Sequence, residues 1–352
     1  MKNIIALLLS TVLIFNLCSC SRNSNTYATR TITDCAGDQV EIPENVTSII
    51  NCVTYGCQVM VGLGLGEYLV GINEDSIESP WMVEMYPKIA EIPKYAFEES
   101  AESLLKANAD VVFVEQPEIA RNLRSKGVTA ITFSYFPIDE MRYAINMLGE
   151  ILEGEALEKC EQYVTYLDNN IKSVADSLDG SLEQRETLYY INGVSNKGLY
   201  KTTGKGSTNC ECAELSYTDF ATSPLIESPT NMVDSEAILA ENPENIIIGG
   251  VYQHVLYDKL ISTPEWSNNS AVKNGNVFTV PMGISAWNRY GIEIALMIPW
   301  TSSKVYPEHF EYDAVQETID FYNTFTNYEL TEQQAQYILN GLTPNGEKEI
   351  AN

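Results

Sequence analysis

The sequence predicts an α/β protein of two Rossmann-like lobes, each built on a mostly parallel sheet, with one long helix between them. An internal repeat is the first reason, because residues 102–114 and 236–248 carry Glu, Leu and Asn in register, followed by an acidic residue and a β-rich apolar run. The second reason is the alternation of short apolar runs with helical segments in both halves. The third is an amphipathic stretch between the halves, over residues 155–178.

The first 19 residues have the pattern of a secretory signal. Lys2 precedes an apolar stretch over residues 4–17, which is shorter than the roughly 20 residues that a bilayer-spanning helix needs. The stretch ends in Leu17-Cys18-Ser19-Cys20, which is similar to a bacterial lipobox and predicts lipidation of Cys20. A plain signal peptide cut nearby is the alternative. Residues 20–30 then form a flexible polar tether, and no later apolar run approaches spanning length.

The charge balance argues against several classes of partner. The chain has 21 Lys and Arg residues against 48 Asp and Glu, a formal net charge of −27, and no run of basic residues. Nucleic-acid binding needs a basic face and is not expected. An acidic surface also repels anionic lipid headgroups, so contact with the membrane is expected through the lipid anchor only. With two histidines, His254 and His309, a His-rich metal site is disfavoured.

Strand candidates divide the mature chain into an N-terminal ligand-binding lobe over residues 31–153 and a C-terminal ligand-binding lobe over residues 181–352. Each candidate is a short apolar run between helical segments, which is the pattern of a parallel sheet covered on both faces. The expected strands are residues 46–52, 69–72, 111–114 and 130–133 in the first lobe and residues 187–191, 246–248 and 277–280 in the second.

The connection between the lobes is expected to be one rigid helix within residues 154–180. Residues 138–152 are also helical in pattern, and Gly154 interrupts the run. Beyond it, apolar residues recur at three- and four-residue steps for about 24 residues, which gives a rod of roughly 36 Å. The stripe consists of Leu157, Cys160, Val164, Leu167, Ile171, Val174 and Leu178, and Asp179-Gly180-Ser181 ends the helix.

Several motifs, in their order along the chain, resemble one family of transport proteins. Residues 33–43 resemble the family's N-terminal hairpin, and Leu63-Gly64-Leu65-Gly66-Glu67 with Val70-Gly71-Ile72 resembles its first helix end and second strand. The two repeated segments, and Trp266 followed by residues 271–278, are also typical. The mature chain is thus similar throughout to a substrate-binding lipoprotein of an ABC importer. It resembles the class III periplasmic binding proteins, in which one rigid helix joins two lobes.

That resemblance implies a function without catalysis and without a cofactor. The protein is expected to capture an iron chelate, a siderophore complex or haem, between its lobes and to deliver it to an ABC permease and its ATPase. The resemblance implies a monomer at the outer face of the cell membrane or in a periplasm, with small lobe closure because the joining helix is rigid. Cobalamin and molybdate or tungstate are alternative ligands. An exported cysteine-dependent redox or metal-cluster enzyme, and a surface sensor or adhesin, are alternative functions.

The resemblance also gives the glutamates of the repeat a role. In the family, one exposed glutamate on each lobe pairs with arginines of the permease, and Glu102 and Glu236 match those positions. Surface ion pairs are individually weak, about 0–1 kcal/mol, so these two are expected to set orientation and association rate more than affinity. An ordinary solvated carboxylate on each helix is the alternative.

Ligand contacts are expected just beyond the carboxyl ends of the strands, because ligands of open α/β sheets bind there. The loops at these ends carry aromatic residues beside a few polar groups, which suits a large or chelated ligand. Trp287 and Arg289 are the strongest candidates, since an arginine in so acidic a chain suits an anionic ligand oxygen. The expected ligand-binding residues are Tyr55, Trp81, Gln116, Tyr135, Tyr252, His254, Trp287 and Arg289.

Six cysteines remain once Cys18 leaves with the signal and Cys20 takes lipid. They are Cys35, Cys52, Cys57, Cys160, Cys210 and Cys212. An exported location permits disulfides, and the sequence does not select among the fifteen full pairings. As an alternative, Cys52 and Cys57 of the first lobe and Cys210 and Cys212 of the second face one cleft as a soft-metal site, although their spacing matches no standard zinc pattern.

Overall fold

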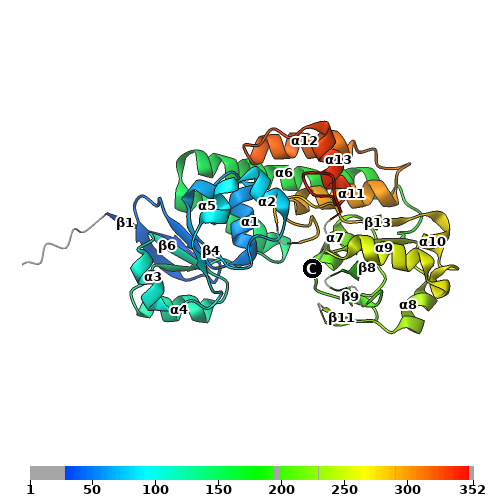
Figure 1. The fold of residues 1–352 in the computed structure, drawn as a ribbon, viewed down its shortest axis with the longest axis horizontal. Coiled ribbons are helices and arrows are strands. Elements are labelled where there is room, and N and C mark those ends of the chain that lie inside the picture. Colours follow the sequence, from blue (N-terminus) through cyan, green and yellow to red (C-terminus); the bar gives the residue numbers. More distant parts are fainter. Residues whose placement is uncertain (1–27, 194, 196–197, 229, 290, 349–352) are drawn as a thin grey trace, which may run out of the picture.

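The computed structural model describes residues 28–348 apart from residues 194, 196–197, 229 and 290. These residues form two α/β lobes at opposite ends of an elongated molecule, with a long helix running along one side (Figure 1). Among them, no helix has both the length and the apolar character needed to cross a membrane. The expected signal segment and most of the expected tether, including Cys20, lie outside the described residues.

The first lobe is built on a parallel sheet of five strands in the order β5-β4-β3-β6-β7. Its strands are β3 (Ile49–Asn51), β4 (Leu69–Asn73), β5 (Lys94–Tyr95), β6 (Val111–Val114) and β7 (Ala130–Thr132). Every residue of β3, β6 and β7 is buried, as expected for a sheet covered on both faces. The helices of this lobe are α1 (Thr54–Gly62), α2 (Pro80–Met85), α3 (Ala101–Ala107), α4 (Pro117–Ser125) and α5 (Ile138–Leu152), with 3-10 turns at Gly66–Tyr68 and Pro87–Glu91.

An antiparallel hairpin of β1 (Thr29–Thr33) and β2 (Gln39–Pro43) precedes this sheet and is pinned to α4 by charge. Arg124 Nη1 lies 3.1 Å from Oδ2 of the buried Asp34. The Asp34 carboxylate also accepts hydrogen bonds from three backbone N–H groups. A buried charge is stable when it is paired and hydrogen-bonded in this way, so the hairpin has a defined position on the lobe.

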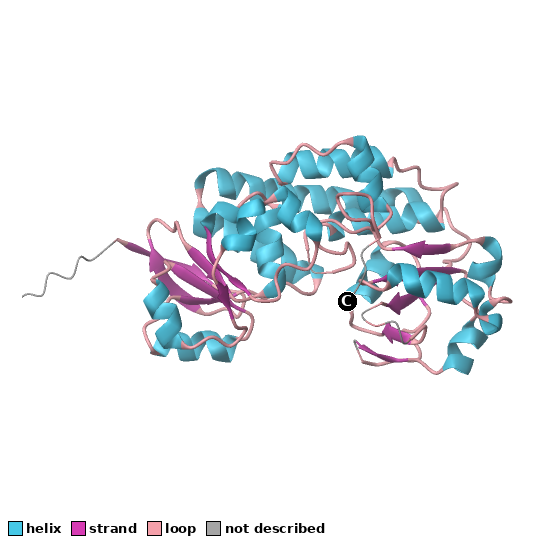
Figure 2. Cartoon of the chain, in the orientation of Figure 1, coloured by secondary structure: helices cyan, strands magenta, loops and turns pink. Residues whose placement is uncertain are grey.

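The second lobe has a parallel sheet of four strands in the order β10-β8-β12-β13. Figure 2 shows the strands of both lobes in magenta, with helices packed around them. Its strands are β8 (Thr187–Asn192), β10 (Asp219–Phe220), β12 (Asn245–Gly249) and β13 (Val277–Thr279). A separate antiparallel ribbon pairs β9 (Lys201–Thr203) with β11 (Thr230–Met232). The helices of this lobe are α7 (Thr208–Leu215), α8 (Ser235–Glu241), α9 (Gln253–Ser262) and α10 (Ser270–Asn274), with a 3-10 turn at Pro264–Trp266.

The repeat seen in the sequence is also a structural repeat. Residues 102–114 cover α3 and β6 of the first lobe, and residues 236–248 cover α8 and β12 of the second. Both helices end at the shared asparagine, since Asn108 and Asn242 adopt left-handed φ angles of 55° and 48°. Asparagine tolerates this conformation better than most residues, so in each copy the helix stops there and the chain turns into a buried strand.

The expected rod between the lobes is α6 (Gly154–Leu178), a helix of 25 residues. At the junction of α5 and α6, Glu153 and Gly154 have positive φ angles of 58° and 53°, which break the helical run. Cys160, Leu167 and Val174 of the predicted stripe are fully buried. The stripe packs against α5 at one end and the C-terminal helices at the other, so the rod is fixed to both parts of the molecule.

After the second lobe the chain returns to this rod. The returning helices are α11 (Ile294–Val305), α12 (Ala314–Phe325) and α13 (Glu332–Leu339). Figure 1 shows them beside α6, and the ring centroids of Tyr163 in α6 and Phe325 in α12 are 5.6 Å apart. The Tyr328 hydroxyl donates to Glu84 Oε1 in the first lobe at 3.1 Å. The C-terminal helices therefore brace the rod and touch both lobes.

Candidate functional site

The carboxyl ends of the two parallel sheets lead into loops that meet between the lobes, a region that we call the interlobe site. Glu78 lies in the loop that follows β4, and Arg289 lies in the loop that follows β13. Glu78 Oε1 and Arg289 Nη1 approach to 4.0 Å, so loops from both lobes meet there. Ligands of open α/β sheets bind beyond the carboxyl ends of strands, which makes this the candidate site.

The second lobe contributes four polar side chains, Tyr190, Asn209, Asn288 and Arg289, which we call the polar cluster. The Asn288 amide donates through Nδ2 to the Tyr190 hydroxyl at 2.6 Å and to Asn209 Oδ1 at 3.1 Å. Burial raises the pKa of Tyr190 to about 12, and the nearby Arg289 guanidinium opposes that rise. Tyr190 is therefore a neutral hydroxyl at physiological pH. The cluster offers one cation beside neutral hydrogen-bonding groups, which suits an anionic ligand.

The loop that carries Arg289 closes around a buried carboxylate. Glu293 is fully buried at the start of α11, and its Oε1 accepts hydrogen bonds from Ser285 N and the Tyr322 hydroxyl, both at 3.1 Å. Its Oε2 accepts from Ser285 Oγ at 3.2 Å. Burial raises the pKa of Glu293, and these donors oppose the rise. A Cβ at Gly283 would lie 1.7 Å from the Tyr322 hydroxyl, so the loop fits this closely only with glycine there.

The first lobe contributes fewer polar groups to the interlobe site. Tyr55, in the first turn of α1, is half-buried, and its ring centroid is 5.6 Å from that of Tyr135. The Thr54 hydroxyl donates to Asn73 Oδ1 at 3.0 Å, which ties α1 to the end of β4. Gln116 is exposed at the N-cap of α4. These residues follow β3, β6 and β7 or end β4, so they share the edge that carries Glu78.

The structure divides seven of the eight expected ligand-binding residues into two groups, and the eighth, His254, is partly exposed but bonded within the protein. Tyr55, Gln116, Tyr252 and Arg289 are exposed or partly exposed near strand ends. Trp81, Tyr135 and Trp287 expose 1%, 2% and 0% of their surface, so they pack inside the protein. Burial raises the pKa of Tyr135 well above its usual value, and its hydroxyl has no hydrogen-bond partner among the described residues. The His254 ring is bonded through Nε2 to the Gly341 carbonyl oxygen at 3.0 Å.

Tyr190, Asn209, Asn288 and Glu78 were not expected at the site from sequence. Tyr190 lies within a strand, where an aromatic residue indicates core. Asn209 and Asn288 are 79 residues apart, and their contact depends on how α7 packs in the second lobe. The position of Asn288 beside Arg289 is the one sequence signal that pointed to it.

The two glutamates of the repeat occupy equivalent surface positions. Glu102 is exposed in the first turn of α3, and Glu236 is exposed in the first turn of α8. Because each helix leads into the amino end of a strand, its first turn lies toward the carboxyl edge of its sheet. Figure 1 places α3 and α8 on the side of the lobes away from α6.

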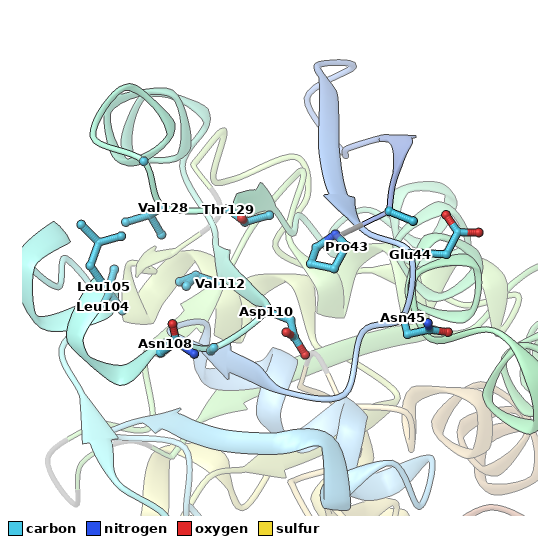
Figure 3. A pocket seen from close by; sticks show the side chains of 13 residues that line it. Pro43, Glu44, Asn45, Leu104, Leu105, Asn108, Asp110, Val112, Val128 and Thr129 are labelled. Atoms are coloured by element: carbon cyan, nitrogen blue, oxygen red, sulfur yellow. The ribbon is translucent and has the colours of Figure 1, made fainter. Parts of the chain in front are cut away.

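A hollow of about 680 Å³ lies on the first lobe, away from the interlobe site. Its lining includes residues that precede β3, β6 and β7, at the amino edge of the sheet (Figure 3). Leu104, Leu105 and Val128 give it an apolar side. The carboxylate of Asp110 is already engaged by the backbone and hydroxyl groups of Thr47 and Ser48. None of the described residues that line the hollow is cationic, so it does not suit an anionic ligand.

All six described cysteines are free thiols. The expected possibility of disulfides is therefore not realised in the described part of the chain. The soft-metal alternative also fails, because no group of three or more His, Cys, Asp and Glu side chains among the described residues could hold a metal ion. Burial raises the pKa of Cys52 and Cys160 to about 12 and that of Cys57 to about 11.

Comparison with known proteins places this geometry in a family context. Residues 90–282, more than half of the chain, match the model of a family described as periplasmic binding protein. The structure is similar to a periplasmic solute binding protein from Veillonella parvula, with 25% identity and a TM-score of 0.77 over 90% of this chain and 99% of that one. No curated protein sequence matches the chain.

Two further solved structures share the fold at lower identity. One is the molybdate periplasmic binding protein MolA of Haemophilus influenzae bound to molybdate, with 21% identity and a TM-score of 0.73 over 86% of this chain and 99% of that one. The other is CeuE of Helicobacter pylori in a nickel–histidine complex, with 19% identity and a TM-score of 0.67 over 87% and 98% of the two chains. The predicted architecture of two parallel-sheet lobes and one long helix, that of the class III binding proteins, is confirmed.

The buried thiols should be chemically inert in the folded protein. The assay uses a chain that begins at Ser21, which holds six cysteines. At pH 8 we expect a thiol reagent to modify at most Cys35 in the folded protein, because only Cys35 is partly exposed, and all six cysteines in denaturant. The reason is that the thiolate is the reactive form and forms only as pH rises toward the raised pKa of about 12 at Cys52 and Cys160. A timed reagent assay with and without guanidinium measures this. Rapid native modification of Cys210 or Cys212 would contradict it.

Proposed function

The chain belongs to the periplasmic binding protein family, and on this premise we propose that it is a lipid-anchored receptor that binds an anionic ligand at the interlobe site and delivers it to an ABC permease and its ATPase. Membership of this family supports an extracytoplasmic location and a role as the binding component of an ABC transporter. The ligand class, the anchor and the contact residues are what the proposal adds.

The polar cluster is the observation that carries the proposal. Arg289 is positioned by the loop around Glu293, and its side chain is 40% exposed at the interlobe site. A guanidinium recognises paired anionic oxygens through its planar set of donors. Asn209 lies in the first turn of α7, where the helix dipole also favours negative charge. These groups would contact the anionic oxygens of a ligand, and the aromatic side chains of Tyr55 and Tyr252 would contact the rest of it.

An iron chelate, a ferric siderophore or haem, is the leading ligand. The described residues contain no cluster able to ligate a bare metal ion, so the protein would hold a complete complex through the oxygens of the chelator. An oxyanion such as molybdate or tungstate is the second candidate, because the similar protein from Haemophilus influenzae is bound to molybdate. Cobalamin is a third. In every case the protein acts by binding, without catalysis or cofactor, and as a monomer.

The other four expected contacts take a supporting role in this proposal. Tyr55, Gln116, Tyr252 and Arg289 are assigned to the ligand because their side chains reach the surface of the site. Trp81, Tyr135, His254 and Trp287 are assigned to the packing behind it. Cys20 would carry the lipid, with residues 20–30 as the tether to the first lobe.

A ligand panel tests the function directly. We expect one of four classes, a ferric siderophore, haemin, cobalamin or molybdate, to raise the melting temperature of the purified protein, because binding to the folded state alone stabilises it by mass action. Thermal shift followed by native mass spectrometry identifies the class and the one-to-one stoichiometry. Catalytic turnover or redox activity in the absence of any permease would contradict the proposal.

Arg289 should dominate the affinity. Arg289→Ala is expected to weaken binding of the identified ligand by tenfold or more, because an anionic oxygen in the polar cluster loses its charged partner. Arg142→Ala is a matched control, since Arg142 pairs with Asp139 of α5 and Asp168 of α6. Calorimetric titration measures both variants. Equal affinities for the Arg289 variant and the wild type would remove this residue from the site.

Glu102 and Glu236 should act in transport and not in binding. Charge reversal of both residues to Lys is expected to abolish uptake in cells, because two positive charges on matching helices would then repel basic pockets of the permease. Ligand affinity should stay within twofold of the wild type. Glu118→Lys with Glu265→Lys is the control pair, since both residues are exposed carboxylates outside the repeat. Uptake that survives the Glu102 and Glu236 reversal would refute the docking role.

A further inference from the structure

The segment that follows α13 is held by both lobes at the interlobe site. His254 in α9 of the second lobe bonds through Nε2 to the Gly341 carbonyl oxygen at 3.0 Å. Trp81 in α2 of the first lobe donates its indole N–H to the next carbonyl, that of Leu342, at 2.8 Å. Since α9 follows β12 and α2 follows β4, both donors come from the carboxyl edges of their sheets. Two consecutive peptide groups therefore connect the two walls of the site.

Local structure gives this segment a defined shape. Gly341 has a left-handed φ of 63°, and a Cβ there would lie 2.1 Å from Gln253 Nε2 of the second lobe. Leu342 N donates to the Tyr337 carbonyl at 2.9 Å, which ties the segment to α13. A tight turn follows, in which Thr343 N donates to the Glu347 carbonyl at 2.8 Å. The segment is thus an ordered element fixed at several points.

We propose that Gly341 and Leu342 form a strap that fixes the spacing of the two lobes and thereby determines the size of ligand that the interlobe site accepts. The helix α6 and the C-terminal helices packed beside it join the lobes along one side of the molecule, which leaves rotation of the lobes about that side as the softest motion. The strap connects the lobes at their facing edges, where it opposes that rotation. Control of lobe spacing follows from the contacts alone, whereas the effect on ligand size rests on the proposed function.

The strap also accounts for the assignment of Trp81 and His254 to packing. An indole has a single N–H donor, so Trp81 cannot bond to Leu342 and to a ligand at the same time. A ligand that accepts a hydrogen bond from the Trp81 N–H must release the strap from the first lobe. The strap and a hydrogen bond from Trp81 to a ligand are therefore mutually exclusive.

The spacing of the lobes can be measured without a ligand. Spin labels on unnatural amino acids at the exposed positions of Lys126 in the first lobe and Lys259 in the second avoid the six native thiols. Pulsed electron resonance then gives the distribution of distances between the lobes. We expect the double variant Trp81→Phe, His254→Leu to broaden this distribution and shift it to longer distances, and a chain ending at Asn340 to do the same.

Trp266→Phe is the matched control, because Trp266 is a fully buried indole of the second lobe outside the strap. Its distribution should superimpose on that of the wild type even where its melting temperature falls. Wild-type distributions in both strap variants would overturn the proposal, as would equal broadening in the control. Because no ligand is present, this experiment tests the strap independently of the ligand panel. If the strap is absent, the protein can still bind its ligand. If the proposed ligand is wrong, the strap can still fix the lobe spacing.

Discussion

Burial of the apolar stripe of α6 is the constraint on which the rest of the structure depends. The stripe turns slowly around a helix of 25 residues, so no single neighbour can cover it. The helix α5 of the first lobe covers part of it, and α11 with α12 covers the rest. Each lobe is thereby placed by the same interface that stabilises the rod, and the space between the lobes is a consequence of how far apart these covering helices lie along α6.

The interlobe site inherits its rigidity from this interface. The Tyr163 hydroxyl of α6 donates to the Ile292 carbonyl at 2.8 Å, and the Tyr322 hydroxyl of α12 donates to Glu293. The two acceptors, Ile292 and Glu293, lie where the loop that carries Arg289 joins α11. Burying Glu293 has a desolvation cost, which raises its pKa, and the surrounding donors offset part of that cost. The buried Glu293 carboxylate thus lowers the stability of the protein while it fixes the shape of the loop. This is consistent with a loop whose shape matters more than its contribution to stability.

Sequence patterns predicted the elements that bury continuous apolar runs and missed those that do not. The strand at residues 111–114 was predicted to the residue, and the repeat identified α3-β6 and α8-β12. The short strands β5 and β9 were missed, because Lys94–Tyr95 and Lys201–Thr203 offer no apolar run. At the candidate site, topology predicted which loops lie together, but the direction of each side chain depends on long-range packing. That is why Trp81 and Trp287 are buried while Asn209 and Asn288 meet.

The acidic surface and the cationic site act at different distances. At physiological ionic strength charges are screened over about 8 Å, so the net charge of −27 would have little effect on the anionic ligand proposed for the site. Glu78, 4.0 Å from Arg289, partly balances the guanidinium there. A half-exposed pair of this kind contributes about 0–1 kcal/mol, so a ligand oxygen that also accepts a hydrogen bond from a second donor of the polar cluster would displace Glu78 at little cost. A simple anion that contacts only the Arg289 guanidinium would bind there little more favourably than Glu78 does. For the proposed anionic ligand, selection would therefore depend on the arrangement of its oxygen atoms more than on its charge alone.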